Sequence, residues 1–366
     1  MKYYIIAGEA SGDLHGSNLI KELHDRDTTA EIRCWGGEMM AAAGGKLVKH
    51  YRDLAFMGFA EVIRNLPAIF KNLAFCKKDI ARFQPDVLVL IDYPGFNMRI
   101  AKWAKERNIK VAWYISPQIW AWKEKRVHAL KRDVDLMLVI LPFEKEFYRK
   151  HDFEVFYVGH PLAEVINNWQ KKHPEIKKEK IIALLPGSRK QEISVKLPVM
   201  LQAATHFPEY RFIVAKAPGL TDDFYNSFLQ RAENTESVSG KTYELLAGSE
   251  AALVTSGTAT LETALFGVPE IICYKGSRLS YEIAKRLIKI KYIGLVNLIM
   301  NKEVVKELIQ QEMNPKNIIA ELNKLLSDER CRARLQKDYA ELRTLLSSGG
   351  NASANAAIKI CQLGKS

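Results

Sequence analysis

The chain has 366 residues, a formal net charge of +12, 48% apolar residues and five cysteines, none of them in C-x-x-C spacing. Its length exceeds what one core usually serves, so we expect two domains, and its few scattered cysteines argue against a disulfide framework or structural zinc and favour a reducing cytoplasm. The positive charge indicates an anionic partner, but no zinc-finger, RRM or KH signature supports nucleic acid as that partner.

Short apolar runs alternate with helical patterns through the first half of the chain. Strands are expected at 3–8, 86–92, 110–116 and 135–141, and helices at 14–24, 67–83, 97–107 and 142–150. This alternation is typical of βαβ units around a parallel sheet, whose strands are buried on both faces.

The second half of the chain repeats the pattern after a polar, Lys-rich stretch at 167–180, which we interpret as an interdomain linker. Strands are expected at 181–188, 210–216, 251–257 and 270–275, and mostly helical residues from about 302 onwards. We therefore predict an α/β fold with two Rossmann-like, doubly wound domains at 1–165 and 166–345, followed by a C-terminal helix at 346–366.

Ligands of open parallel sheets bind outside the carboxyl ends of the strands, so the residues that follow each strand are the candidates for a site. Asp92 ends the second strand of the first half, where it could be a catalytic carboxylate or a helix cap. Ser11, Gly12 and Asp13 follow the first strand and could contact a ligand or cap the next helix. A hydrolytic triad with His15 is disfavoured, because no G-x-S-x-G elbow is present.

The loop SPQIWAWKEKRV at 116–127 places two tryptophans among basic residues after a further strand. It could be a core loop, a stacking platform for single-stranded nucleic acid, or the wall of a sugar or acyl pocket. The candidate pocket residues are Ser116, Gln118, Trp120 and Trp122.

Two loops of the second half suit a nucleotide. Gly187, Ser188 and Arg189 combine close backbone approach, a hydroxyl and a fixed cation at a helix start, as a phosphate requires. Ser256, Gly257, Thr258 and Glu262 form a second small-residue helix start, in which the carboxylate could accept ribose hydroxyls. Each segment alone could equally be an ordinary strand-to-helix turn, so the nucleotide interpretation depends on the pair.

No metal or other cofactor is predicted. Asp133 and Asp135 form an Asp-x-Asp triplet, but it opens a strand instead of closing one, and the eight histidines show no H-x-x-x-H pairing.

Eight segments resemble the bacterial lipid-A-disaccharide synthase family in their order and spacing. They are GEASGD, IDYPGFN, SPQIWAWKEKRV, LPFEKEFY, GHP, LLPGSRKQEI, SGTATLE and LVNLI, and they extend over nearly the whole chain. The resemblance implies a GT-B-type, inverting glycosyltransferase whose two Rossmann-like domains face a cleft, with C-terminal helices packing back on the N-terminal domain. It implies UDP-2,3-diacylglucosamine as donor, 2,3-diacylglucosamine 1-phosphate as acceptor, and the β(1→6) disaccharide 1-phosphate and UDP as products.

The resemblance also assigns roles by motif. Asp92 matches the proposed base, Arg189 the loop arginine, and Asn297 the asparagine of the LVNLI segment, which joins the donor-binding candidates. Some relatives carry a second Asp where this chain has Gly95, so a two-carboxylate mechanism is left open. A UDP-sugar 2-epimerase of similar build would share the nucleotide loops, and it is the alternative function.

Acylated substrates imply work at a membrane surface, and we expect a cytoplasmic protein attached peripherally to the anionic inner membrane. The segment 278–292, with Lys285 and Lys289, has the pattern of a basic amphipathic helix, and the apolar stretch 56–75 is a second candidate. Either could instead cover a core. No stretch approaches the roughly 18 uncharged apolar residues of a membrane-spanning helix. The oligomeric state is left open, with a homodimer as one option.

Overall fold

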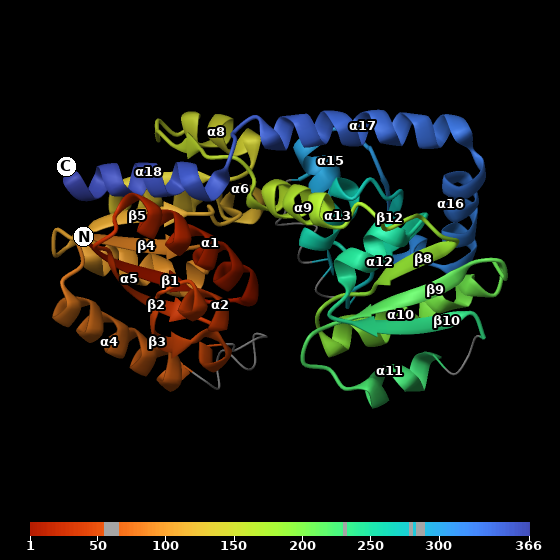
Figure 1. Cartoon of the computed structure of the whole chain (residues 1–366), viewed down its shortest axis with the longest axis horizontal. Coiled ribbons are helices and arrows are strands. Elements are labelled where there is room, and N and C mark those ends of the chain that lie inside the picture. Colours follow the sequence, from red (N-terminus) through yellow and green to blue (C-terminus); the bar gives the residue numbers. More distant parts are fainter. Residues whose placement is uncertain (55–65, 230–232, 278–280, 283–289) are drawn as a thin grey trace. The chain divides into compact units, whose positions relative to one another are not determined.

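The computed structural model describes residues 1–54, 66–229, 233–277, 281–282 and 290–366 (Figure 1). It divides into two compact units, which are described separately. The first unit contains Met1–Glu164 together with Leu346–Ser366, and the second contains Val165–Leu345.

The first unit is built on a seven-stranded parallel sheet in the order β3-β2-β1-β4-β5-β6-β7. Its strands are β1 (Lys2–Ala7), β2 (Glu31–Gly36), β3 (Lys46–His50), β4 (Val87–Ile91), β5 (Lys110–Tyr114), β6 (Leu136–Val139) and β7 (Phe156–Tyr157). Its helices include α1 (Ala10–Arg26), α2 (Glu38–Ala42), α4 (Leu66–Phe83), α5 (Pro94–Lys105), α6 (Ile119–Trp122), α7 (Val127–Asp133), α8 (Pro142–Arg149) and α18 (Ala352–Lys365).

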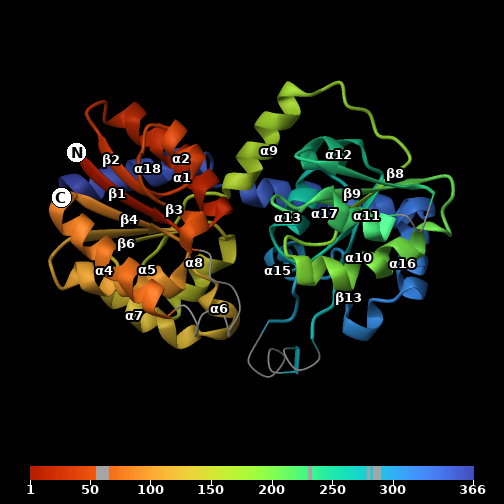
Figure 2. The same ribbon diagram turned by 90° about the horizontal axis from the view of Figure 1, so that it is seen from below.

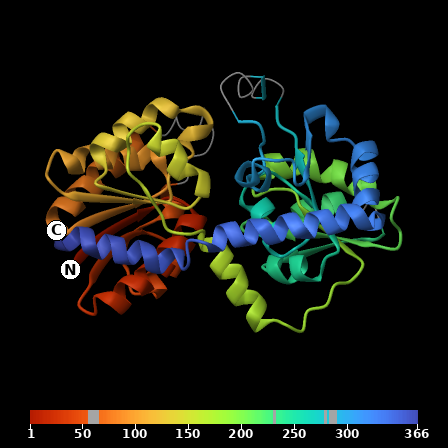
Figure 3. The same ribbon diagram turned by 90° about the horizontal axis from the view of Figure 1, so that it is seen from above.

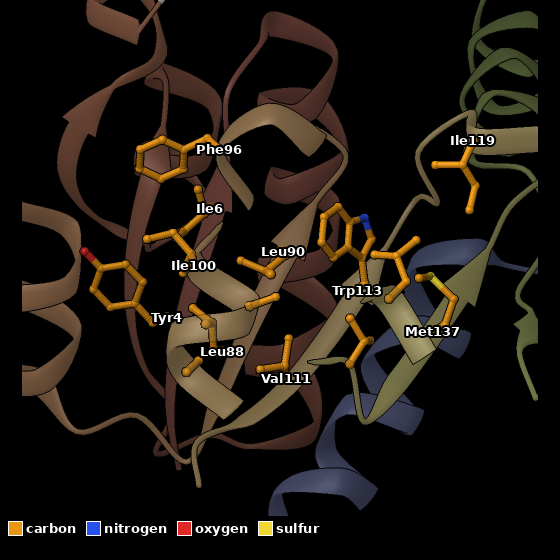
Figure 4. Packing of buried hydrophobic residues seen from close by; sticks show 14 of the residues in the cluster. Tyr4, Ile6, Leu88, Leu90, Phe96, Ile100, Val111, Trp113, Ile119 and Met137 are labelled. Carbon is orange, nitrogen blue, oxygen red and sulfur yellow. The ribbon is translucent and has the colours of Figure 1, made fainter. Parts of the chain in front are cut away.

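Helices cover both faces of this sheet (Figure 2), which explains why its central strands read as continuous apolar runs. In β4, Leu88 and Leu90 point into one core and Val87, Val89 and Ile91 into the other, because side chains alternate along a strand. Figure 4 shows the first of these cores, in which strand residues meet Phe96 and Ile100 of α5.

The last helix, α18, completes the opposite core. Its residues Ala356, Ala357 and Ile360 are fully buried in the same core as Leu19 and Ile20 of α1. Figure 3 shows this helix beside the first unit, so the expectation that the C-terminus packs back on the first domain is confirmed. The returning chain passes Gly159, where a Cβ atom would lie 2.7 Å from the carbonyl oxygen of Gly350. The GHP segment therefore accommodates the C-terminal chain.

The second unit has a six-stranded parallel sheet in the order β10-β9-β8-β11-β12-β13. Its strands are β8 (Ile181–Leu185), β9 (Arg211–Lys216), β10 (Thr235–Ser239), β11 (Ala251–Val254), β12 (Glu270–Tyr274) and β13 (Lys306–Ile309). Its helices include α10 (Lys190–Ala204), α11 (Asp222–Leu229), α12 (Thr242–Gly248), α13 (Thr258–Leu265), α15 (Leu295–Met300), α16 (Pro315–Ser327) and most of α17 (Glu329–Ser347). The two doubly wound α/β sheets predicted from the sequence are confirmed.

One local expectation is wrong. The first part of the supposed linker, residues 167–172, belongs to helix α9 (Pro161–Lys172), because Leu162, Ile166 and Trp169 recur at helical spacing and give the polar segment an apolar face. The expectation of mostly helical residues from about 302 onwards is confirmed by α16, α17 and α18, although strand β13, which pairs with β12, precedes them.

Candidate functional site

Each sheet has one point where its strand order reverses, and the candidate loops follow the strands at that point. In the first unit the reversal lies between β1 and β4, and in the second between β8 and β11. Ala7 pairs with Ile91, and Leu185 pairs with Val254, so the loops after each pair of strands begin side by side. Ligands of doubly wound sheets bind at such switch points.

Asp92 begins the loop after β4 in an uncommon backbone conformation. Asp92 and Tyr93 have φ values of +43° and +49°, which cost about 1–3 kcal/mol each for residues other than glycine. The buried side chain of Asn97 holds this turn, because its Nδ2 atom donates to the carbonyl oxygens of Ile91 and Asp92 at 3.3 and 2.8 Å. Tyr93, not Asp92, is the N-cap of α5, and it makes no side-chain cap, so Asp92 is not a helix cap.

The environment of Asp92 raises the pKa of its carboxyl group from 3.8 to about 7. Burial is the largest cause, the negative charge of Glu9 adds to it, and the backbone amide of Tyr93 opposes both. A carboxyl group with a pKa near neutrality can accept and release a proton at physiological pH.

Glu9 is a residue that the sequence analysis missed. It is exposed, is the N-cap residue of α1 and directly follows Gly8, the first residue after β1. The Tyr93 ring lies against Gly8. Its position after a strand at the switch point could have identified it, since the same rule selected Asp92.

The other candidates in this loop differ in accessibility. Ser11 is exposed, and Gly12 packs against Ala7. Asp13 is buried and accepts hydrogen bonds from the backbone amides of Gly37, Met39 and Met40 at 2.7, 3.2 and 3.0 Å, so it caps α2 instead of its own helix. A ligand contact by Asp13 would require one of these bonds to break.

A buried network supports the tryptophan loop. The Ser116 hydroxyl lies 2.6 Å from the hydroxyl of Tyr148, and Trp120 donates its indole N–H to Glu144 at 3.2 Å. Burial raises the pKa of the Glu144 carboxyl to about 7. Hydrogen bonds to this carboxyl, including those from the amide of Leu141 and the Trp120 indole, lower the pKa but do not cancel the effect of burial. The loop is thus held to α8 through polar groups.

Gln118 and Trp122 face solvent at the outer end of this loop. The Trp122 side chain is 51% exposed, and the Lys123 Nζ atom lies 3.9 Å from the centroid of its ring. These two candidates remain accessible to a ligand, whereas Ser116 is buried and Trp120 is half-buried.

In the second unit, the loop between β8 and α10 has exposed residues before the helix begins. Gly187 has a φ of +126°, and a Cβ atom there would lie 2.6 Å from the Glu192 carboxylate, so both conformation and space require glycine. Ser188 is exposed, and Arg189 is 60% exposed with its guanidinium 3.5 Å from Glu192. The side chain of Arg189, the N-cap residue, does not cap the first turn of α10, whose amide groups suit an anion.

The loop after β11 starts α13 in a similar way. Gly257, with a φ of +133°, is the N-cap residue and has no side chain with which to cap this helix. Ser256 is half-buried and Thr258 is exposed. Glu262 accepts a hydrogen bond from the Tyr243 hydroxyl at 3.2 Å, and burial raises the pKa of its carboxyl.

A buried lysine that the sequence analysis missed joins these two loops. The Lys196 Nζ atom donates to the Thr255 hydroxyl at the end of β11 and lies 3.7 Å from the carboxylate of Glu192 on α10. Only 3% of Lys196 is exposed, and burial lowers the pKa of its ammonium group. Nothing in the local pattern separates this lysine from a surface helix residue.

Asn297 is fully buried and saturated with protein partners. Its Nδ2 atom donates to Val305 and Glu307 at 2.9 Å, and its Oδ1 atom accepts from the amides of Val304 and Val305. The structure thus uses it to hold α15 to the chain before β13, and a donor contact would require one of these bonds to break.

The described ranges contain no group of three or more His, Cys, Asp or Glu side chains placed to hold a metal ion. Of the Asp-x-Asp pair, Asp133 binds Arg132, and Asp135 accepts the backbone amide of Val111 at 2.9 Å, at the amino ends of the strands.

Comparisons with known proteins identify the family. The family model described as lipid-A-disaccharide synthetase matches residues 3–360. A lipid-A-disaccharide synthase of Geobacter metallireducens is 40% identical over 99% of this chain and 97% of its own length, and lipid-A-disaccharide synthase 1 of Legionella pneumophila is 37% identical over 94% and 93%.

Solved structures share the fold at low sequence identity. UDP-GlcNAc 2-epimerase from Neisseria meningitidis, bound to UDP-GlcNAc, has a TM-score of 0.67 at 13% identity and covers 99% of both chains. The glycosyltransferase of kitacinnamycin has a TM-score of 0.66 at 14% identity and covers 99% of this chain and 98% of its own. Such likeness describes the fold and does not separate a transferase from an epimerase.

Proposed function

The chain belongs to the lipid-A-disaccharide synthetase family and is a glycosyltransferase, and from this premise we propose how its residues perform the transfer. The reaction moves 2,3-diacylglucosamine from its UDP derivative to the 6-hydroxyl of 2,3-diacylglucosamine 1-phosphate with inversion, and gives the β(1→6) disaccharide 1-phosphate and UDP. The family match favours this reaction over a UDP-sugar 2-epimerase.

Asp92 is the proposed general base, and its raised pKa at the switch point of the first unit carries the proposal. As the 6-hydroxyl oxygen of the acceptor attacks the anomeric carbon of the donor, its proton passes to the Asp92 carboxylate. A pKa of about 7 leaves a substantial carboxylate fraction at neutral pH while keeping the group basic enough to take the proton.

The loops of the second unit are proposed to hold the UDP portion of the donor. Negative charge grows on the diphosphate as the bond to the sugar breaks, and the uncapped first turns of α10 and α13 offer amide donors to it. Arg189 supplies an exposed cation, and Glu262 is placed on α13 to accept ribose hydroxyls.

The product identifies the activity directly. Mass spectrometry of wild-type reactions with both acylated substrates should detect the disaccharide 1-phosphate only when donor and acceptor are present together. Conversion of the UDP-sugar to its 2-epimer without acceptor would instead support the alternative. Added EDTA should leave the rate unchanged, because we expect no metal to be required.

The donor site can be tested separately by calorimetry. Arg189→Ala and Glu262→Gln should each weaken UDP binding and leave the Michaelis constant for the acceptor nearly unchanged. Lys190→Ala is a suitable control, because Lys190 is also exposed at the start of α10. Wild-type UDP affinity in both site variants would move the nucleotide elsewhere.

Attachment to the inner membrane is proposed through the first unit. A groove of about 480 Å³ between α4 and α5 has Phe70 and Trp103 in its lining together with Lys77 and Lys102, and Phe70 is 62% exposed. Apolar contact and attraction to anionic lipid, worth about 1 kcal/mol per cation near the surface, would act together there.

No helix in the described part of the chain has both the length and the apolar character needed to cross a membrane. Most of the segment 278–292, including Lys285 and Lys289, and residues 55–65 of the other candidate segment lie outside the described residues. Phe70→Ser should lower binding to anionic vesicles without changing UDP affinity. Unchanged vesicle binding would direct attention to Lys285 and Lys289.

A further inference from the structure

Two cations lie against the exposed tryptophan of the first unit. The Lys123 Nζ atom is 3.9 Å, and the Arg126 guanidinium carbon 5.9 Å, from the centroid of the Trp122 ring. Both cations are half-buried, so each has lost part of its hydration. The ring holds them together through cation–π attraction.

A third cation, Arg99, approaches from α5. This helix packs against α7, whose N-cap residue is Arg126, and the positive charge of Arg99 acts on Arg126. The Arg99 guanidinium donates a hydrogen bond to the carbonyl oxygen of Gly95, three residues after Asp92. It therefore lies at the same end of α5 as the proposed base.

The three cations are not neutralised by ion pairs in the part of the chain that the structure describes. None of them forms an ion pair with a carboxylate among the residues that the structure describes, and the adjacent Glu124 lies 3.2 Å from His151 instead. Burial and then the charge of Arg99 lower the pKa of Arg126, and burial and then Arg126 lower the pKa of Lys123. Lys123 and Arg126 are half-buried and Arg99 is exposed, and Arg126 is repelled by both of the others, so an anion that binds between the three would stabilise them.

We propose that Arg99, Lys123 and Arg126 form a binding site for a phosphomonoester, which in this chain is the 1-phosphate of the acceptor sugar. The assignment of the ligand rests on the proposed function. A phosphomonoester carries up to two negative charges, and guanidinium groups bind it through paired hydrogen bonds. The 6-hydroxyl and the 1-phosphate belong to one sugar ring, so the base and the phosphate site must lie within one sugar's length, as the Arg99–Gly95 contact suggests.

Michaelis constants for two acceptors, with and without the 1-phosphate, test this site in detergent micelles. Arg126→Gln and Lys123→Gln should each raise the constant for the phosphorylated acceptor about tenfold, the effect of losing one charge-assisted contact. Both variants should use the acceptor without phosphate as the wild type does and should bind UDP normally. Lys125→Gln is the matched control, since Lys125 is exposed in the same loop, and it should behave as wild type.

Three outcomes discriminate among the explanations. Equal losses with both acceptors would mean that the cations only position the loop, and would overturn the site. Weaker binding of the variants to vesicles containing phosphatidic acid, with an unchanged constant for the acceptor, would make a lipid headgroup the ligand and overturn the acceptor assignment. If the wild type makes no disaccharide, the proposed function fails by itself, and weaker binding of glucosamine 1-phosphate by Arg126→Gln would still support a phosphate site.

Discussion

Replacing Asp92 with asparagine should abolish most activity and stabilise the protein at the same time. Asparagine has nearly the same shape and tolerates the left-handed backbone at this position, so the turn should persist. Without a base, the turnover number should fall roughly 10² to 10⁴-fold, while UDP binding is kept.

The gain in stability follows from the raised pKa of Asp92. Below pH 3.8 the carboxyl group is protonated in both folded and unfolded chains and has no effect. Between pH 3.8 and about 7 the unfolded chain ionises while the folded chain does not, so the free energy of unfolding of the wild type falls by about 1.4 kcal/mol per pH unit. The full loss is about 4 kcal/mol above pH 7, and partial solvent contact reduces our expectation to about 2–4 kcal/mol.

Thermal unfolding of Asp92→Asn and wild type from pH 4 to pH 8 measures this effect. The difference in melting temperature should be small at pH 4 and should grow towards pH 8. Asp25→Asn is the control, because Asp25 is exposed on α1 of the same unit and should show no such dependence. A difference that does not change with pH would refute the buried-carboxylate argument, and near-normal turnover would refute the role of Asp92 as base.

Three further predictions concern single charged residues. Glu9→Gln removes a negative charge that raises the pKa of Asp92. The acid limb of the pH profile of kcat/KM, expected near pH 7, should therefore move to lower pH, and an unmoved limb would contradict this coupling. Lys196→Met should weaken UDP binding about 3- to 30-fold and uridine binding much less, because the attraction lost is that between the ammonium group and the diphosphate. Equal losses of UDP and uridine affinity in calorimetry would indicate a purely structural lysine. The buried carboxylate oxygens of Glu270 have no hydrogen-bond partner among the described residues, and burial raises the pKa of this group well above its usual value. Glu270→Met should therefore raise the melting temperature more at pH 8 than at pH 4, and the opposite trend would exclude this cause.

The sequence could predict the central strands because their burial is visible in composition. Strand β4 is buried on both faces and therefore consists of the uninterrupted run Val87–Ile91. Strand β10 (Thr235–Ser239) lies at a sheet edge and is partly exposed, so its polar sequence carries no such signal. The polar surface of α9 likewise concealed a helix behind the appearance of a linker.

The sequence alone determined which residues follow the strands, and with them the candidates Asp92, Arg189 and Glu262, because parallel strands place their carboxyl ends at one edge of a sheet. Only the tertiary structure decided which of those strands are neighbours at a switch point, since strand order depends on pairing between distant segments. It also decided that Glu9 approaches Asp92 and that the side chain of Asn297 forms its hydrogen bonds with other residues of the chain. Such contacts arise between segments far apart in the chain, and burial, which sets the pKa of Asp92, is a property of the packed fold and not of any local stretch of sequence.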